Sequence, residues 1–287
     1  MMVSVLMLIV LPSACYLQEV DNRPSERLVI GGGYVNVAQF PHFVQLLLIW
    51  GKSFGYNICG ASVISSHWAI TVAHCVAGPL GLKLLMSRNS MSDEAHVMEV
   101  QLAYIHEESY SFAMFPTYDI ALLKTYERIP CNDRIKPIRL ARETDDDNIG
   151  LLTAIGFGPP IETLILRSLR LKGVNLTSLP VTDCYVDKYR IQRLKNEPQT
   201  ARSIMCLEDV DVQGANPSHG DSGGPVTGHS AALNQTVLVA LVSQQAPFKR
   251  TIAVRVSWHT DWIYKVMRKF SDSHSEGKFQ GTTKLRG

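Results

Sequence analysis

The chain has 287 residues, of which 46% are hydrophobic and 19% charged, and its formal net charge is +2 at pH 7. This length allows one large domain, or two lobes, around a sizeable core. The small net charge gives no reason to expect nucleic acid or an acidic membrane surface as a partner, so the function has to be sought in motifs.

The N-terminal segment 1–15 has the features of a secretory signal peptide. Residues 3–11 form a nearly unbroken apolar run, followed by the small residues Ser13 and Ala14. This length suits a signal-peptide core, whereas a membrane span needs about 20 apolar residues. We therefore predict a secreted protein, cleaved after Cys15. The sequons at Asn175 and Asn234 are then candidates for N-glycosylation.

From residue 28 onward, short apolar runs alternate with turns that contain Gly, Pro or Asn. Examples are 43–49, 97–102 and 237–242. This spacing favours antiparallel strands over alternating βαβ units. Large apolar residues recur at helical spacing between 258 and 270, which predicts an amphipathic helix with its aromatic residues in the core. Segment 271–287 is polar and rich in Gly, Lys and Ser, which predicts a disordered tail.

Three segments far apart in the sequence carry residue types suited to nucleophilic catalysis. His74 lies in Thr-Val-Ala-His-Cys at 71–75, and Asp119 begins an apolar run that reads as a buried strand. Ser222 lies in Gly-Asp-Ser-Gly-Gly-Pro at 220–225, where glycines allow a sharp turn and bring backbone N–H groups close to a substrate. Each segment alone suits an ordinary structural role. Together they supply a nucleophile, a base and an orienting acid.

Further motifs occur in a consistent order around these three segments. They are Phe-Pro at 40–41, Cys-Gly-Ala-Ser at 59–62 and Gly-Phe-Gly at 156–158. With them, the chain resembles the trypsin/chymotrypsin-type serine proteases over residues 28–270. The resemblance implies an all-β fold of two six-stranded antiparallel β-barrels with a C-terminal α-helix, and a catalytic site in the cleft between the barrels.

The resemblance also implies a role for each residue of the site. Ser222 is the nucleophile, His74 the general base, and Asp119 the acid that orients the imidazole. The backbone N–H groups of Gly220 and Ser222 form the oxyanion hole. Ser243 matches the family's serine near the triad acid, and we count it among the substrate-binding residues as well.

Two disulfides follow from the resemblance, Cys59–Cys75 and Cys184–Cys206. Cys15 and Cys131 remain. If Cys15 leaves with the signal peptide, Cys131 is an unpaired thiol. If Cys15 stays, a bond between the two would tether the propeptide. We favour the lone Cys131.

Residues 16–27 are the expected propeptide. In the resembled family, cleavage after a basic residue frees an apolar N-terminus, whose ammonium group pairs with the acid before the nucleophile, here Asp221. The basic residue is Arg27, but the matching start is Val29, so Leu28 lies between them. Either the new terminus bulges through the glycines at 31–33, or cleavage follows Leu28.

The specificity pocket departs from the trypsin pattern. Its floor falls at Asn216, where trypsin-like members carry an Asp, and a neutral amide cannot neutralise a buried substrate Lys or Arg. Gln245 and Thr251 replace wall glycines, which narrows the slot. Ser218 stands where a bracing cysteine is usual. We predict cleavage after small or medium apolar residues rather than after Lys or Arg.

The sequence thus predicts a zymogen-activated serine endopeptidase that acts on proteins or peptides, is activated by another protease and is open to protease inhibitors. It predicts no cofactor, metal, nucleic acid or membrane partner. The alternative is a non-catalytic homologue that serves as a secreted binding or regulatory module, although such relatives usually lose a triad residue. An esterase is a third possibility, but no G-x-S-x-G elbow follows a strand here.

Overall fold

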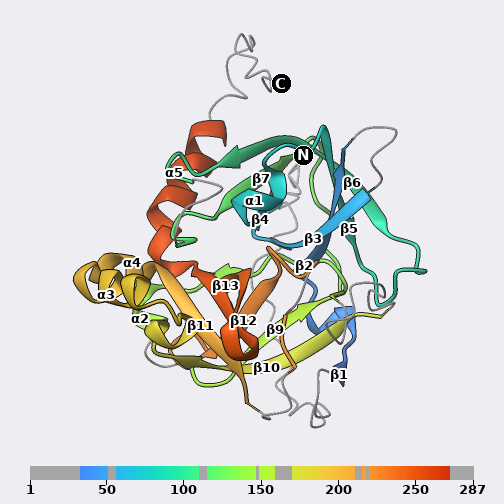
Figure 1. The fold of residues 1–287 in the computed structure, drawn as a ribbon. Coiled ribbons are helices and arrows are strands. Elements are labelled where there is room, and N and C mark those ends of the chain that lie inside the picture. Colours follow the sequence, from blue (N-terminus) through green and yellow to red (C-terminus); the bar gives the residue numbers. More distant parts are fainter. Residues whose placement is uncertain are drawn as a thin grey trace, which may run out of the picture.

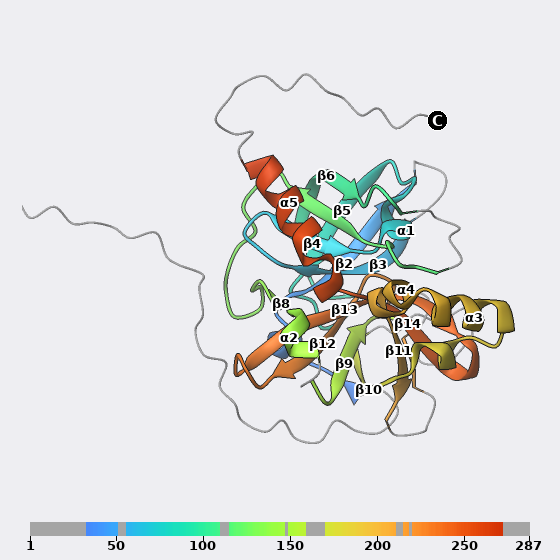
Figure 2. The ribbon, with the colours of Figure 1, turned by 90° about the vertical axis from the view of Figure 1, so that its left-hand side faces the viewer.

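The computed structural model describes residues 33–50, 56–109, 115–146, 149–158, 170–210, 215–217 and 220–271. Two β-barrels lie against each other, and a helix close to the C-terminal end packs beside the first barrel (Figures 1 and 2). The predicted signal peptide, the propeptide and all but the first residue of the predicted tail lie outside the described residues.

The first barrel is closed by six antiparallel strands in the order β2-β3-β4-β7-β6-β5. Its strands are β2 (Phe43–Ile49), β3 (Tyr56–Val63), β4 (Trp68–Thr71), β5 (Gly81–Met86), β6 (His96–Ile105) and β7 (Ala121–Thr125). Side chains alternate between the two faces of a strand, so every second residue turns inward. Leu46, Ile70, Leu84 and Leu122 are fully buried.

The second barrel is a ring of six antiparallel strands, because β9 pairs with both β10 and β12. Its strands are β9 (Leu152–Gly156), β10 (Lys172–Leu179), β11 (Ile204–Asp209), β12 (Pro225–Ser230), β13 (Gln235–Ala246) and β14 (Arg250–Arg255). Two short strands extend it, β1 (Gly33–Tyr34) on β10 and β8 (Arg139–Leu140) parallel to β13. The predicted architecture of two six-stranded barrels is confirmed.

The helices are short except near the C-terminal end. They are α1 (Ala73–Val76), α2 (Glu143–Asp146), α3 (Lys188–Asn196), α4 (Pro198–Ser203) and α5 (Thr260–Ser271), with 3-10 turns η1 (Val37–Gln39), η2 (Val181–Cys184), η3 (Pro247–Lys249) and η4 (Ser257–His259). Helix α5 buries Ile263 and Val266 in the core of the first barrel, and buried Lys124 donates a hydrogen bond to the Phe270 carbonyl at 2.8 Å. The predicted C-terminal helix is therefore present.

Stability is expected to depend on pH through His42, at the start of β2. This side chain is buried, and no hydrogen-bond partner reaches its Nε2 from the described part of the chain. Burial lowers the pKa of His42 to about 3 from an ordinary 6.5. At pH values between about 3 and 6.5, His42 therefore binds a proton in the unfolded chain but not in the folded chain. We expect the free energy of unfolding to fall as pH drops from about 6.5 towards 3, by at most about 4 kcal/mol.

Denaturant unfolding measured between pH 7 and pH 4 tests this expectation. The variant His42→Phe should flatten the pH dependence, whereas His229→Gln, at an exposed position of β12, should leave it unchanged. An equally steep dependence in His42→Phe would show that other groups cause the acid destabilisation.

Candidate active site

His74 lies in α1, immediately after β4, on a segment held by a disulfide. Cys75 is bonded to Cys59 of β3, with 16 residues of sequence separation, for which the chain-entropy account gives about 3 kcal/mol of stabilisation. Cys59 and Cys75 are buried, while His74 keeps 37% of its side chain exposed. The disulfide therefore fixes the segment that carries His74, and part of the imidazole ring stays exposed.

Asp119 lies two residues before β7 and is hydrogen-bonded to His74 through both carboxylate oxygens. His74 Nδ1 lies 2.8 Å from Oδ2, and the His74 backbone N–H donates to Oδ1 at 2.9 Å. The Ser243 hydroxyl donates to Oδ2 at 2.6 Å. Because an ionised carboxylate only accepts, Nδ1 carries the proton. This orientation leaves Nε2 as the ring nitrogen that can accept a proton.

The electrostatics of Asp119 favour its charged form. Burial acts to raise the pKa of this carboxyl, but the hydrogen bonds and charge of His74 and the Ser243 hydroxyl together lower the pKa of Asp119 below its ordinary value. A group with a depressed acidic pKa contributes stability that is present above its ordinary value and lost as pH falls below it. Asp119 is therefore a carboxylate throughout the neutral range.

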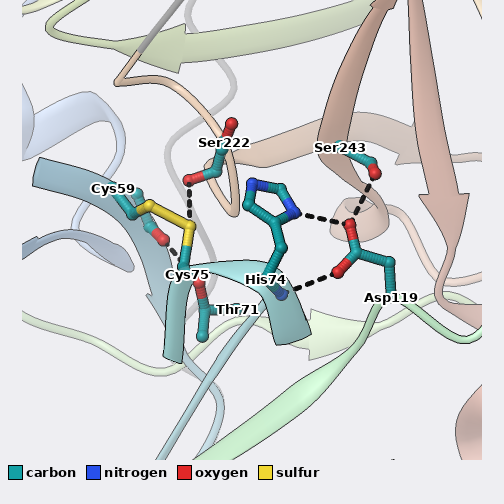
Figure 3. The surroundings of a disulfide bond; sticks show 8 residues. Cys59, Thr71, His74, Cys75, Asp119, Ser222 and Ser243 are labelled. Atoms are coloured by element: carbon teal, nitrogen blue, oxygen red, sulfur yellow. Dashed lines mark hydrogen bonds and ion pairs between the residues drawn. A yellow bond between two sulfur atoms is a disulfide. The ribbon is translucent and has the colours of Figure 1, made fainter. Parts of the chain in front are cut away.

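Ser222 lies on the opposite side of the His74 ring from Asp119 (Figure 3). Its carbonyl oxygen accepts from the Gly60 N–H at 2.7 Å and lies 3.7 Å from Cys75 Sγ. No hydrogen bond joins the Ser222 and His74 side chains among the described residues. Catalytic hydrogen bonds are often long before substrate binds, so this geometry is compatible with a nucleophile and its base.

The turn around Ser222 depends on two glycines with positive φ, Gly220 at +99° and Gly223 at +79°. The Gly223 N–H donates to the Val242 carbonyl at 2.7 Å, and the Gly224 N–H to the Asp221 carbonyl at 2.8 Å. Within the described ranges, the N–H groups of Gly220 and Ser222 have no acceptor. Two unpaired amides beside the nucleophile are what an oxyanion site requires.

Asp221 lies against two glycines at the end of β9, Gly156 as its last residue and Gly158 two residues later. Its Oδ1 accepts from the Gly158 N–H at 2.7 Å, and only 9% of the residue is exposed. A Cβ on Gly156 would lie 1.9 Å from Oδ1, and one on Gly158 2.1 Å from Oδ2. Both glycines are therefore required by the carboxylate. Its predicted activation partners Arg27, Leu28 and Val29 lie outside the described residues.

Two of the predicted pocket residues are in direct contact. Buried Thr251 donates from Oγ1 to Asn216 Oδ1 at 2.5 Å, which links the expected floor to the expected wall. Exposed Gln245 pairs with Thr251 across β13 and β14. The second predicted disulfide, Cys184–Cys206, is present. It lies close to Thr251, because Cys184 Sγ is 3.7 Å from the Thr251 carbonyl oxygen. Ser218 lies outside the described residues.

Cys131 corrects one expectation. It is disulfide-bonded, and no cysteine within the described residues is free. Its partner lies outside those residues, and Cys15 is the one cysteine that the other two bridges leave over. The lone thiol that we favoured is wrong for the full chain. That expectation assumed removal of Cys15 with the signal peptide, whereas the structure is that of the whole chain.

The residues that support the turn around Ser222 were not predicted from the sequence. Thr71 Oγ1 donates to the Gly60 carbonyl at 2.8 Å, and Gly60 in turn holds Ser222. A Cβ on Gly60 would lie 2.4 Å from the Gly224 Cα. The only sequence signal was the position of Thr71 and Gly60 within the quoted motifs.

The described residues show neither a metal-binding cluster nor a membrane-spanning helix. They hold no group of three or more His, Cys, Asp or Glu side chains arranged for a metal ion. No helix among them has the length and apolar character needed to cross a bilayer.

Comparisons with known proteins identify the family of the chain. The family model described as Trypsin matches residues 29–263. Hypodermin-B of Hypoderma lineatum is 26% identical over 212 residues, 73% of this chain and 75% of that protein. Chymotrypsin-like elastase family member 1 of Rattus norvegicus is 25% identical over 247 residues, 83% of this chain and 89% of that protein.

Among solved structures, the scabies mite inactivated protease paralogue S-D1 aligns with a TM-score of 0.65 at 18% identity, covering 88% of this chain and all of that one. This likeness concerns the fold alone. Because the family model spans well over half of the sequence, the chain belongs to the trypsin family of serine proteases.

Proposed function

We propose that the protein is a secreted serine endopeptidase that uses Ser222, His74 and Asp119 as its catalytic triad. The observation that carries the proposal is the pair of hydrogen bonds from His74 to the buried Asp119, which leaves Nε2 of the imidazole facing Ser222 (Figure 3). The family to which the chain belongs cleaves proteins and peptides, and this chain retains every residue type that its chemistry requires.

In the proposed reaction, His74 Nε2 takes the hydroxyl proton of Ser222 as Oγ attacks the scissile carbonyl. Asp119 keeps the imidazole in the required tautomer and stabilises the imidazolium that forms. The same imidazolium then gives its proton to the leaving amine. Water completes the cycle by hydrolysing the acyl-enzyme in the same way.

The developing oxyanion is stabilised by the N–H groups of Gly220 and Ser222. Support comes from their lack of acceptors within the described ranges and from the positive φ of Gly220. Loss of one such donor costs about 2.7–4 kcal/mol of transition-state stabilisation. The oxyanion hole is therefore expected to provide a large share of the rate enhancement.

Activation is proposed to follow cleavage by another protease after Arg27 or Leu28. The new ammonium group would then reach Asp221, whose carboxylate is buried beside Gly158. The ammonium group would then donate charge-assisted hydrogen bonds to this carboxylate, beside the bond that it accepts from the Gly158 N–H. N-terminal sequencing of the active form distinguishes the two cleavage sites.

The pocket is proposed to accept small or medium apolar residues. The Thr251–Asn216 hydrogen bond joins wall to floor and supplies no negative charge for a basic side chain. We expect wild-type kcat/KM to be higher for Ala or Val at the cleaved position than for Lys or Phe. The variant Thr251→Gly removes a side chain from the pocket wall. It should raise kcat/KM for Phe relative to Ala at least about tenfold, since fitting even one more methylene into an apolar pocket changes kcat/KM by this factor.

A fluorogenic peptide series read in parallel for wild type, Thr251→Gly and Thr251→Ser tests the pocket. The serine variant keeps the hydroxyl and should keep the wild-type preference. Dominant wild-type cleavage after Lys or Arg would contradict the assignment of Asn216 as the floor.

Secretion makes N-glycosylation testable, and we expect it at Asn234 but not at Asn175. Asn234 is exposed in the turn between β12 and β13, with φ of +47°. Asn175 lies within β10, paired with β9, and its Oδ1 accepts from Thr153 Oγ1 at 3.2 Å. Protein from a secreting eukaryotic host should lose mass in Asn234→Gln and keep it in Asn175→Gln. A glycan mapped to Asn175 would contradict this prediction.

The function itself is tested by hydrolysis of a denatured protein substrate. Chain processed to its mature N-terminus should release peptides, and identically processed Ser222→Ala should not. A small-molecule or protein inhibitor of serine proteases should block the wild-type activity.

A non-catalytic binding module is the second candidate function. The observation that favours this function is the lack of a hydrogen bond between the Ser222 and His74 side chains among the described residues. If the protein is a binding module, the correctly processed chain should hydrolyse no substrate. It should bind a partner with the same affinity in wild type and in Ser222→Ala.

A further inference from the structure

The segment that carries Asp119 has little regular structure of its own. Asp119 follows Thr117 and Tyr118 and lies two residues before β7. Its N–H donates to the Pro116 carbonyl at 3.2 Å, and the Ile120 N–H donates to the Tyr118 carbonyl at 2.8 Å. These are turn contacts, so the position of the carboxylate depends on what packs against the segment.

His259 holds the segment from the N-terminal side. It ends η4, and only 2% of the residue is exposed. Its Nε2 lies 2.9 Å from the Thr117 carbonyl, two residues before Asp119. A carbonyl only accepts, so Nε2 carries the proton and donates. A residue from the end of the second barrel thus anchors the acid of the first.

His106 holds the segment from the C-terminal side. Its backbone N–H donates to the Ile120 carbonyl at 3.1 Å, one residue after Asp119. Its Nδ1 accepts from the Glu108 N–H at 3.1 Å, which requires an unprotonated Nδ1 and therefore a neutral ring. The two histidines thus bind backbone carbonyls on both sides of Asp119, that of Thr117 before it and that of Ile120 after it.

Ring contacts join the two anchors. His106 stacks on Tyr118 with centroids 4.7 Å apart, lies 4.8 Å from the Trp262 ring, and meets His259 edge-to-face at 5.5 Å. Trp262 is itself fixed, because its Nε1 donates to Glu107 Oε2 at 2.8 Å. Helix α5 and the end of β6 therefore clamp the Asp119 segment through one cluster.

Burial keeps both rings neutral near pH 7, against the charges of nearby carboxylates. Burial, with a smaller contribution from His106, lowers the pKa of His259 to about 4, although the hydrogen bond to the Thr117 carbonyl acts to raise it. Burial also lowers the pKa of His106, against the charges of Glu107 and Glu108. Asp119 itself adds a negative charge, and α5 carries exposed Asp261 at its start and the basic residues Lys265, Arg268 and Lys269 further along.

We propose that His259 is a positioning residue for catalysis, which holds Asp119 against His74 through its hydrogen bond to the Thr117 carbonyl and its packing on His106 and Tyr118. The proposal rests on the triad of the proposed function. It goes beyond it by assigning a catalytic consequence to a residue that touches neither the substrate nor the triad side chains.

Two variants separate the hydrogen bond from the packing. His259→Phe keeps a ring but has no donor, and His259→Gln keeps an amide N–H near the position of Nε2. We expect His259→Phe to lower kcat about tenfold with KM unchanged, because small misplacements of a catalytic group cost rate rather than binding. The acid limb of its kcat/KM–pH profile should move to lower pH. His259→Gln should keep most of the activity.

A matched control and a second readout complete the experiment. Val266→Ala removes buried volume from α5 outside the cluster, so it should lower stability without moving the pH profile. The NMR resonance of the His74 Nδ1 proton, bound to Asp119, should shift in His259→Phe and not in Val266→Ala. This signal needs no turnover, so it reports on positioning even if the protein hydrolyses nothing.

A wild-type pH profile and an unshifted Nδ1 resonance in folded His259→Phe would overturn the proposal. A shifted resonance in a protein without activity would support the positioning role and count against the proposed endopeptidase function.

Discussion

Replacing His74 with alanine is expected to lower kcat of the processed enzyme about 10⁶-fold, because Ser222 loses the base that takes its proton. Asp119→Asn should cost about 10⁴-fold, since an amide at that position stabilises the wrong tautomer of the imidazole. Combining His74→Ala with Ser222→Ala should cost no more than either change alone, because the residues act as one unit.

Single-turnover hydrolysis of a reactive ester, with thermal unfolding of each variant, measures these effects. His96→Ala, at an exposed position of β6, is the control and should keep wild-type activity. Additive losses in the double variant would show that His74 and Ser222 do not work on the same step.

The second large effect is expected at Gly223, which combines a φ of +79° with close backbone contacts. A Cβ there would lie 2.1 Å from Thr71 Oγ1 and 2.4 Å from the Gly60 carbonyl oxygen. Gly223→Ala should therefore cost about 4 kcal/mol of stability. It should also lower kcat about 100-fold by displacing the neighbouring Ser222.

Denaturant unfolding and kcat measured together test this expectation. Gly150→Ala is the matched control, because a Cβ there meets nothing within 4 Å. Adding Thr71→Ala to Gly223→Ala should restore only part of the stability, since the Gly60 carbonyl still obstructs the new methyl group. If Gly223→Ala and Gly150→Ala unfold at the same denaturant concentration, the packing described for the nucleophile turn is wrong.

The fold was predictable because its signals are local. A short apolar run marks strands such as β2, and the helical spacing of Ile263 and Val266 marks α5. Helices α3 and α4 were not predicted. Their sequence is mostly polar, and α3 is stabilised by the Asp187 cap on the Tyr189 N–H and by burial of Leu194 beside Cys184. Those contacts arise only after the chain has folded.

The candidate site divides in the same way. His74, Asp119 and Ser222 stand in short motifs whose residue types carry their chemistry, so their sequence alone points to them. The support of the site comes from distant segments. Thr71 reaches the Ser222 turn through Gly60, and His259 reaches the Asp119 segment from the far end of the chain. A single sequence contains no record of such pairings.

The proposed function requires a reactive Ser222, and covalent labelling measures this reactivity without any substrate. The protein is processed to its mature N-terminus, treated with a fluorophosphonate probe, digested and mapped by mass spectrometry. We expect one labelled residue, Ser222, with labelling abolished in His74→Ala and unchanged in His96→Ala. An unlabelled Ser222 in correctly processed wild-type protein, or equal labelling with and without His74, would contradict it.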